Sequence, residues 1–159
     1  MLTRIHRLAA WMTATVLVCS CRVGVEKEQA ARLALLNFFD KLSGGEYTAA
    51  VASFCGSYET LVSFNPDLDP DDHAGLWQRG CQVNGVQCLG IRTATFNERT
   101  AEGEYIFTVE FSNQDGSLFV RQACCGEDPT TAPQFQFEYR VVEGGDGQFR
   151  VLDMPVYVP

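Results

Sequence analysis

The chain has 159 residues, of which 46% are hydrophobic and 20% are charged, and its formal net charge at neutral pH is −8. Binding to phosphates requires a basic surface, so this acidic composition excludes nucleic acid as an expected partner. The length and the apolar content suit one globular domain with a single core. Acidity of this degree mainly keeps a protein surface solvated, although it also suits a cationic ligand.

The first twenty residues have the pattern of a secretory signal peptide. They begin with the cations Arg4 and Arg7 and continue without a charge from Leu8 to Val18. A helix needs roughly 20 apolar residues to cross the hydrocarbon core of a membrane, and this run is shorter. We therefore expect a segment that is removed after export and not a permanent transmembrane anchor.

The end of this segment consists of Val18, Cys19, Ser20 and Cys21. A branched apolar residue three positions before a cysteine, with a small residue directly before it, resembles the lipobox of bacterial lipoproteins. The resemblance implies cleavage before Cys21, lipid on Cys21 and a location on the extracytoplasmic face of a bacterial membrane. Each buried methylene contributes about 0.8 kcal/mol, so two or more acyl chains make release slow. An ordinary signal peptide that is cleaved nearby is the alternative.

This interpretation divides the chain into three parts. Residues 1–20 form the signal peptide, residues 21–27 a lipidated tether, and residues 28–159 a single domain. Removing the first part leaves 139 residues with ten cations and twenty acids, a net charge of −10.

Five cysteines remain beside the lipidated one, and export favours disulfides between them. They are Cys55, Cys81, Cys88, Cys124 and Cys125. Two bridges with one cysteine left over can form in fifteen ways, so the connectivity stays open. The Asn-Gly pair at 84–85 is a signal for a tight hairpin, which would place Cys81 opposite Cys88 within disulfide reach. Adjacent residues of a strand point to opposite faces, so we expect Cys124 and Cys125 to choose separate partners, one of them Cys55. A vicinal bridge that acts as a redox switch is the alternative.

Two helices are expected at the start of the domain. The first covers residues 26–42, with apolar residues at helical spacing. Its main stripe is Leu33, Leu36, Phe39 and Leu42, widened by Leu35 and Phe38. After a Ser-Gly-Gly stop, a second helix is predicted from Glu46 to Val62.

The segment from Asn65 to His73 holds four aspartates and two prolines. Asp67, Asp69 and Asp71 match the start of a calcium loop, which makes them weak candidates for metal binding. However, an aspartate stands where the loop needs glycine, and a glutamine stands where it needs glutamate. We therefore expect a helix over residues 69–79 that is capped by Asp69, with Pro70 in its first turn. No cofactor is expected, and His73 is interpreted as a surface residue of this helix.

Beyond Cys81 the spacing of apolar residues changes from about 3.6 to 2, which is typical of strands. Strands are predicted over residues 86–97, 104–112, 117–123, 134–141 and 148–158, joined by short turns. Short turns imply antiparallel neighbours. Helices followed by a meander make an α+β domain, in which a curved antiparallel sheet packs on the N-terminal helices.

The order of these elements resembles the nuclear transport factor 2-like superfamily, whose cystatin-like cone is built from leading helices and a bent sheet. The resemblance covers residues 28–158. It is carried by the Ala31 to Leu42 helix, the turn from Gly44 to Tyr47, a helix ending near Phe54, and the later hairpins. It implies a fold only, because no position here matches a catalytic motif of the superfamily.

Members of that superfamily hold small molecules or bind proteins in the mouth of the cone, and some are isomerases, cyclases or hydrolases. Because no catalytic residue can be assigned, we expect a non-enzymatic module that binds a small ligand or an envelope protein. The alternative is a small-molecule enzyme that uses a carboxylate in the cone pocket.

Overall fold

The computed structural model describes the backbone of residues 5–123 and 132–158, and the side chains from Gly24 onward within these ranges. The chain forms two compact units, residues 1–30 and 31–159, and the boundary between them falls within α1. None of the helices in the described ranges is both long enough and apolar enough to cross a membrane.

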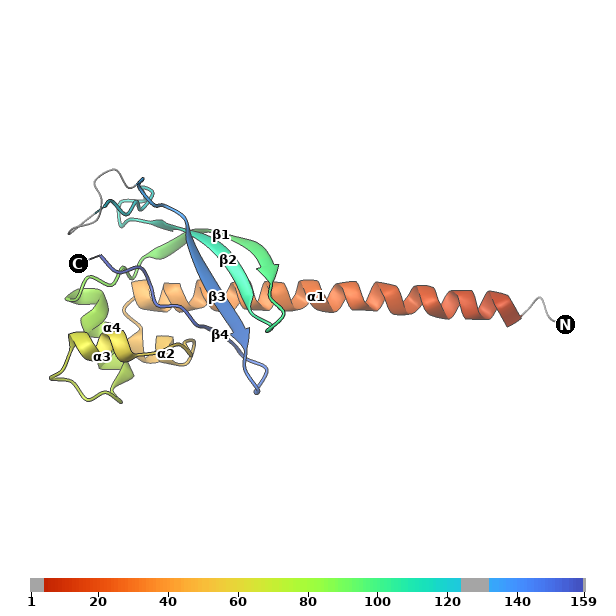
Figure 1. The fold of residues 1–159 in the computed structure, drawn as a ribbon, viewed down its shortest axis with the longest axis horizontal. Coiled ribbons are helices and arrows are strands. Elements are labelled where there is room, and N and C mark those ends of the chain that lie inside the picture. Colours follow the sequence, from red (N-terminus) through yellow and green to blue (C-terminus); the bar gives the residue numbers. More distant parts are fainter. Residues whose placement is uncertain (1–4, 124–131, 159) are drawn as a thin grey trace. The chain divides into compact units, whose positions relative to one another are not determined.

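Helices precede strands along the chain, and the strands form one antiparallel sheet (Figure 1). The helices are α1 (Ile5–Ser43), α2 (Tyr47–Val51), α3 (Glu59–Phe64) and α4 (His73–Gln82). The strands are β1 (Gly90–Arg99), β2 (Tyr105–Ser112), β3 (Phe137–Glu143) and β4 (Phe149–Val151), in the spatial order β1-β2-β3-β4. The predicted α+β class with an antiparallel sheet is therefore confirmed.

The part of α1 in the second unit buries a broad apolar face. Its buried residues are Ala31, Leu35, Phe38, Phe39 and Leu42, each at most 1% exposed. Leu33, which the sequence places in the main stripe, is 48% exposed. The predicted face was therefore centred too far to one side, because Leu35 and Phe38 are fully buried in the core and Leu33 is not.

Two neighbouring phenylalanines of α1 connect the helical layer to the sheet. The ring of Phe38 lies 5.7 Å from that of Trp77 in α4. The ring of Phe39 lies 4.9 Å from Phe111 in β2 and 5.0 Å from Tyr139 in β3. This segment of α1 is thus enclosed between α4 on one side and the sheet on the other, which places the core around it.

The predicted second helix is interrupted in the middle. The backbone N–H of Cys55 donates to the carbonyl of Val151 at 2.9 Å, and Phe54 forms a parallel bridge with Val151. A β carbon at Gly56 would collide with the carbonyl of Leu152. Residues 54–56 therefore run extended against β4, and the helical spacing predicted over 46–62 is divided between α2 and α3.

Helix α4 begins at His73, at the end of the acidic segment and later than predicted. The Oδ1 of Asp72 accepts the backbone N–H of Gly75 at 2.9 Å and caps the helix. The carboxylate of Asp69 instead accepts the N–H of Asp71 at 3.0 Å, which closes a turn before the helix. The prediction that Asp69 caps the helix was wrong. Its carboxylate closes the turn before the helix, three residues before the capping residue Asp72.

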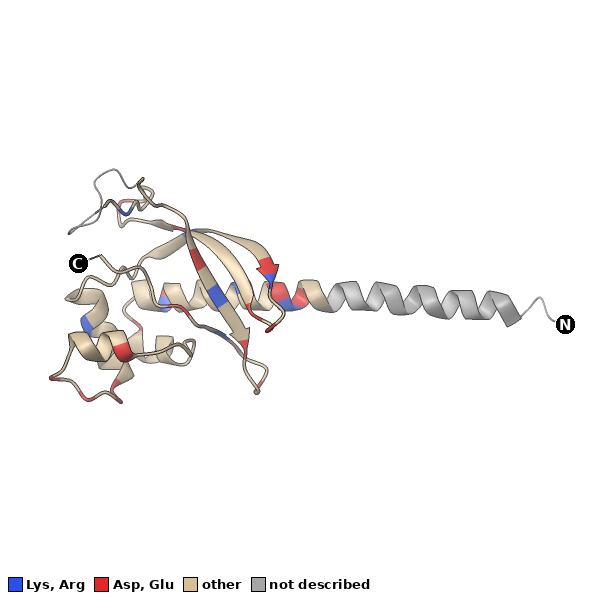
Figure 2. Cartoon of the chain, viewed as in Figure 1, with Lys and Arg blue, Asp and Glu red and all other residues tan. Residues whose placement is uncertain are grey.

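The predicted alternation of buried and less buried residues is confirmed in β2. In β2, Tyr105, Phe107, Val109 and Phe111 face the core, as predicted. The strand predicted over 117–123 is reduced to two isolated bridges, and the one predicted over 148–158 ends at Val151. Charged side chains of both signs are spread over the described helices, strands and loops (Figure 2).

Candidate functional site

The interior between α1 and the sheet is filled by side chains. Phe38, Phe39 and Phe107 are each 0% exposed, and Phe111 is 2% exposed. The ring of Phe39 meets those of Phe38 and Phe111 edge-on or tilted, and the ring of Phe107 meets that of Phe96 edge-on, at centroid distances typical of aromatic packing. Aromatic side chains therefore occupy the space between these two layers.

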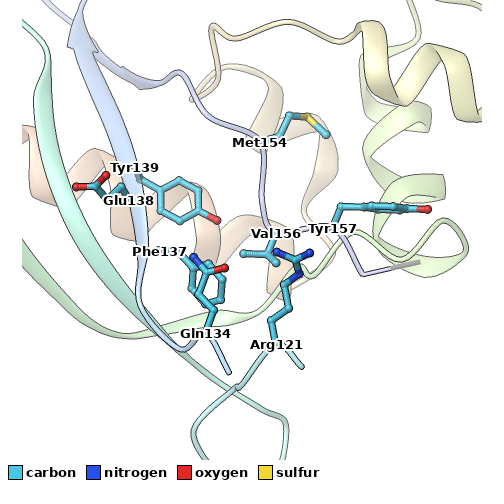
Figure 3. A pocket seen from close by; sticks show the side chains of 8 residues that line it. All are labelled: Arg121, Gln134, Phe137, Glu138, Tyr139, Met154, Val156 and Tyr157. Atoms are coloured by element: carbon cyan, nitrogen blue, oxygen red, sulfur yellow. The ribbon is translucent and has the colours of Figure 1, made fainter. Parts of the chain in front are cut away.

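A pocket of about 350 Å³ lies between β3 and the C-terminal segment (Figure 3). This volume is near the lower end of the range for small-ligand sites. It is lined by Arg121, Gln134, Phe137, Glu138, Tyr139, Met154, Val156 and Tyr157.

The pocket exists because the C-terminal segment leaves β3 just after β4. The N–H of Leu152 still donates to the carbonyl of Arg140 at 3.0 Å, which continues the ladder by one residue. The N–H of Arg140, however, donates to the carboxylate of Asp153 at 2.6 Å, where the ladder would supply a backbone carbonyl. The same carboxylate accepts from the guanidinium of Arg140 at 2.6 Å. Asp153 thereby ends the pairing and turns the chain away.

Beyond this point the C-terminal segment pairs with the loop that follows α4. Gln87 donates its backbone N–H to Val156 at 2.7 Å, and Val158 donates its own to Gly85 at 3.0 Å. An antiparallel bridge joins Val86 to Tyr157. The sheet is thus split between β3 and the C-terminal segment, and the split is the pocket.

The floor of the pocket is apolar apart from one phenol. Phe137 is 7% exposed and Tyr139 is 2% exposed, and both belong to the inner face of β3. Burial raises the pKa of the Tyr139 phenol well above its ordinary value, and the backbone hydrogen bond with Val156 opposes this rise only in part. The phenol therefore keeps its proton at any physiological pH and can donate a hydrogen bond but cannot act as a base.

The rim carries a guanidinium and an amide. Arg121 and Gln134 are joined by two backbone hydrogen bonds of 2.8 and 3.0 Å, which hold their two chain segments together as an isolated bridge. In Figure 3 the guanidinium of Arg121 points toward Val156, whereas the side chain of Glu138 points away from the pocket. Glu138 therefore lines the pocket mainly through its backbone. The chemistry on offer is apolar contact, one positive charge and a few hydrogen bonds.

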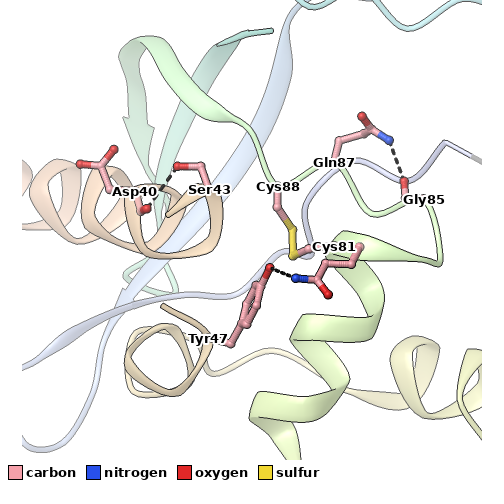
Figure 4. The surroundings of a disulfide bond; sticks show 8 residues. Asp40, Ser43, Tyr47, Cys81, Gly85, Gln87 and Cys88 are labelled. Atoms are coloured by element: carbon pink, nitrogen blue, oxygen red, sulfur yellow. Dashed lines mark hydrogen bonds between the residues drawn. A yellow bond between two sulfur atoms is a disulfide. The ribbon is translucent and has the colours of Figure 1, made fainter. Parts of the chain in front are cut away.

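The structure joins Cys81 to Cys88, the pair expected from the sequence, with a Cα–Cα distance of 5.4 Å (Figure 4). The local structure differs from the predicted hairpin, because Cys81 lies in the last turn of α4. Both Val83 and Asn84 donate their N–H groups to the carbonyl of Arg79, and the chain reverses at a glycine with φ of 78°. The Asn-Gly pair thus ends a helix here, a role in which left-handed glycine is common.

The remaining predicted residues do not meet at the pocket. Cys55 is a free, exposed thiol among the described residues, and its expected partners Cys124 and Cys125 lie outside them. The structure does not describe the side chain of Cys21, so its lipidation stays a prediction. Metal binding by the acidic segment gains no support, since no group of three potential ligands occurs among the described residues.

Two members of the acidic segment have structural roles. The Oδ2 of Asp67 accepts a hydrogen bond from the guanidinium of Arg79 at 2.8 Å. The ring of His73 stacks on that of Tyr58 with centroids 3.8 Å apart. Neither residue lines the pocket at the split in the sheet.

The pocket residues were missed because the sequence pattern of residues 148–158 favours one continuous strand. Asp153 and Pro155 were the available signals, since a proline lacks the N–H that a ladder needs. Comparison with known proteins adds no candidate role: no family model, curated protein or solved structure matches the chain.

Proposed function

We propose that the protein is a lipid-anchored, extracytoplasmic binding module that holds its ligand in the pocket at the split of the sheet. The observation that carries the binding role is the lining of this pocket. It is mainly polar, with a guanidinium from Arg121, an amide from Gln134 and a phenol from Tyr139 that keeps its proton, and it includes a few apolar side chains. Such a lining can hold and orient a ligand, and it supplies no group poised to take up a proton.

A nuclear transport factor 2-like cone is the proposed form of the domain. The order of elements supports it, since helices come first and a four-stranded antiparallel meander follows. The position of α1 between α4 and the sheet also supports it. In this domain aromatic side chains occupy the interior, so the proposed ligand site lies at the edge of β3.

The proposed location rests on the N-terminal sequence and on the cysteines. Val18, Ser20 and Cys21 match three positions of the lipobox, whereas Cys19, at the position between Val18 and Ser20, is less usual there. The Cys81–Cys88 disulfide gives independent support, because structural disulfides persist mainly in oxidising compartments outside the cytoplasm.

Metabolic labelling tests the anchor. Bacteria that express the full chain are grown with an alkyne-tagged fatty acid, and membranes are separated from soluble material. The wild-type protein is expected to carry the label and to sediment with membranes. Cys21→Ser should lose both properties, whereas the matched control Cys19→Ser should keep both. Labelling that survives in Cys21→Ser would contradict the proposal.

A further inference from the structure

We infer that the pocket binds a short extended peptide, which pairs with the backbone of Glu138 and completes the sheet where the C-terminal segment has left it. This inference rests on the binding role proposed above and names the class of ligand. It follows from the direction of backbone groups in β3, from the register of the sheet and from the side chains around the gap.

The backbone of Glu138 points into the pocket. The N–H and carbonyl of Arg140 both face the side of β4, because they bond to Asp153 and Leu152. Residues two apart in a strand direct their backbone groups to the same side. The N–H and carbonyl of Glu138 therefore face the gap, and no other described residue pairs with them on that side.

The register of the sheet leaves one pairing position open. Val142 pairs with Arg150, and Arg140 receives the N–H of Leu152. The next partner along this ladder would face Glu138, but Asp153 has diverted the chain before it reaches that place. Exposed strand edges of this kind are templates for an added strand. An extended peptide offers both a donor and an acceptor at the spacing that Glu138 requires.

The side chains around the gap suit such a peptide. Phe137 and Val156 line the pocket beside the ring of Tyr139, so an apolar side chain of the peptide can contact them, whereas the side chain of Met154 points away from Phe137 (Figure 3). Arg121 at the rim favours a carboxylate, which a peptide supplies either from an acidic residue or from its C-terminus. A volume of about 350 Å³ admits a short segment of chain and not a folded element.

Hydrogen exchange on the full protein, purified from host membranes into lipid nanodiscs, tests the inference. The probe is a pool of acetylated hexapeptides that alternate Val or Ile with Thr and end in Asp. Binding is expected to slow exchange in the peptide fragment that contains Glu138, with little change in β1, the opposite edge strand. No protection at millimolar peptide would overturn the inference.

Two perturbations separate backbone pairing from simple apolar contact. N-methylation of the central peptide bonds removes donors, and it should weaken binding about fivefold or more, since each lost hydrogen bond leaves an unmet partner. Glu138→Pro removes the N–H that faces the pocket and should abolish protection, whereas Glu138→Gln should bind like the wild type because this side chain points away. If N-methylated peptides bind equally well, the pocket recognises side chains only and the inference is wrong.

Two further comparisons identify the carboxylate that binds and distinguish failure of this inference from failure of the proposed function. Better binding by peptides with a free C-terminus than by amidated peptides identifies the terminal carboxylate, and equal binding identifies the acidic side chain. Both results agree with strand addition. Failure of peptide binding in a protein that still labels at Cys21 would reject the peptide and leave the anchor standing, whereas loss of labelling alone would reject the anchor.

Discussion

Removing the Cys81–Cys88 disulfide should destabilise the domain by an amount that follows from its short loop. The two cysteines are separated by seven positions, so the bond closes a loop of eight residues. In the chain-entropy treatment, a loop of this size reduces the freedom of the unfolded chain by about 2.5 kcal/mol at 25 °C. Replacing both cysteines by serine should therefore lower the free energy of unfolding by about 2 to 3 kcal/mol.

Urea denaturation followed by tryptophan fluorescence measures this change, because Trp77 is fully buried in the same helix as Cys81. Both proteins are compared in the Cys55→Ser background, so that any bridge to Cys55 is absent from each of them. The Cys55→Ser protein unfolded with a reductant should match the variant that also lacks Cys81 and Cys88. A double variant within about 0.5 kcal/mol of the wild type would refute the reasoning that the bond restrains the unfolded chain.

Three further predictions concern single side chains, each measured by thermal or urea denaturation. Tyr58→Phe should cost about 1 kcal/mol or more, because the indole N–H of buried Trp77 loses its acceptor at 3.2 Å. Asp72→Ala should cost about 1 kcal/mol as the loss of a helix cap, and more than Asp69→Ala; the reverse order would show that the cap is assigned wrongly. Hydrogen bonds from the guanidinium of Arg150 lower the pKa of Asp146 to about 2. The contribution of this carboxylate to stability is therefore present above about pH 4 and is lost as the pH falls toward 2. Asp146→Asn should therefore be less stable than the wild type at pH 6, and the difference should vanish near pH 2.

The sequence predicted correctly those elements in which one face packs against the core and the other does not. In β2, alternate residues from Tyr105 to Phe111 face the core, as their spacing predicts. The helical structure of residues 26–42, the C-terminal part of α1, followed from their apolar periodicity, but the orientation of the buried face did not. Leu33 is largely exposed because Phe38 and Phe39 each have aromatic partners in a different layer, and only tertiary contacts reveal that choice.

The candidate site was not predictable in the same way, because it depends on where a strand stops. Residues 148–158 alternate well enough to indicate one strand, yet the carboxylate of Asp153 takes the N–H of Arg140 and ends the pairing. The Asn-Gly pair at 84–85 has a similar ambiguity, since left-handed glycine serves both hairpins and helix ends. In each case the local pattern permits two outcomes, and contacts made with distant residues decide between them.

The most direct test of the proposed role is the intact mass of the protein extracted from bacterial membranes that contain the full chain. We predict a product that begins at Cys21 and carries a diacylglyceryl group on the sulfur of that residue. A soluble, unmodified product that begins at another residue would contradict it.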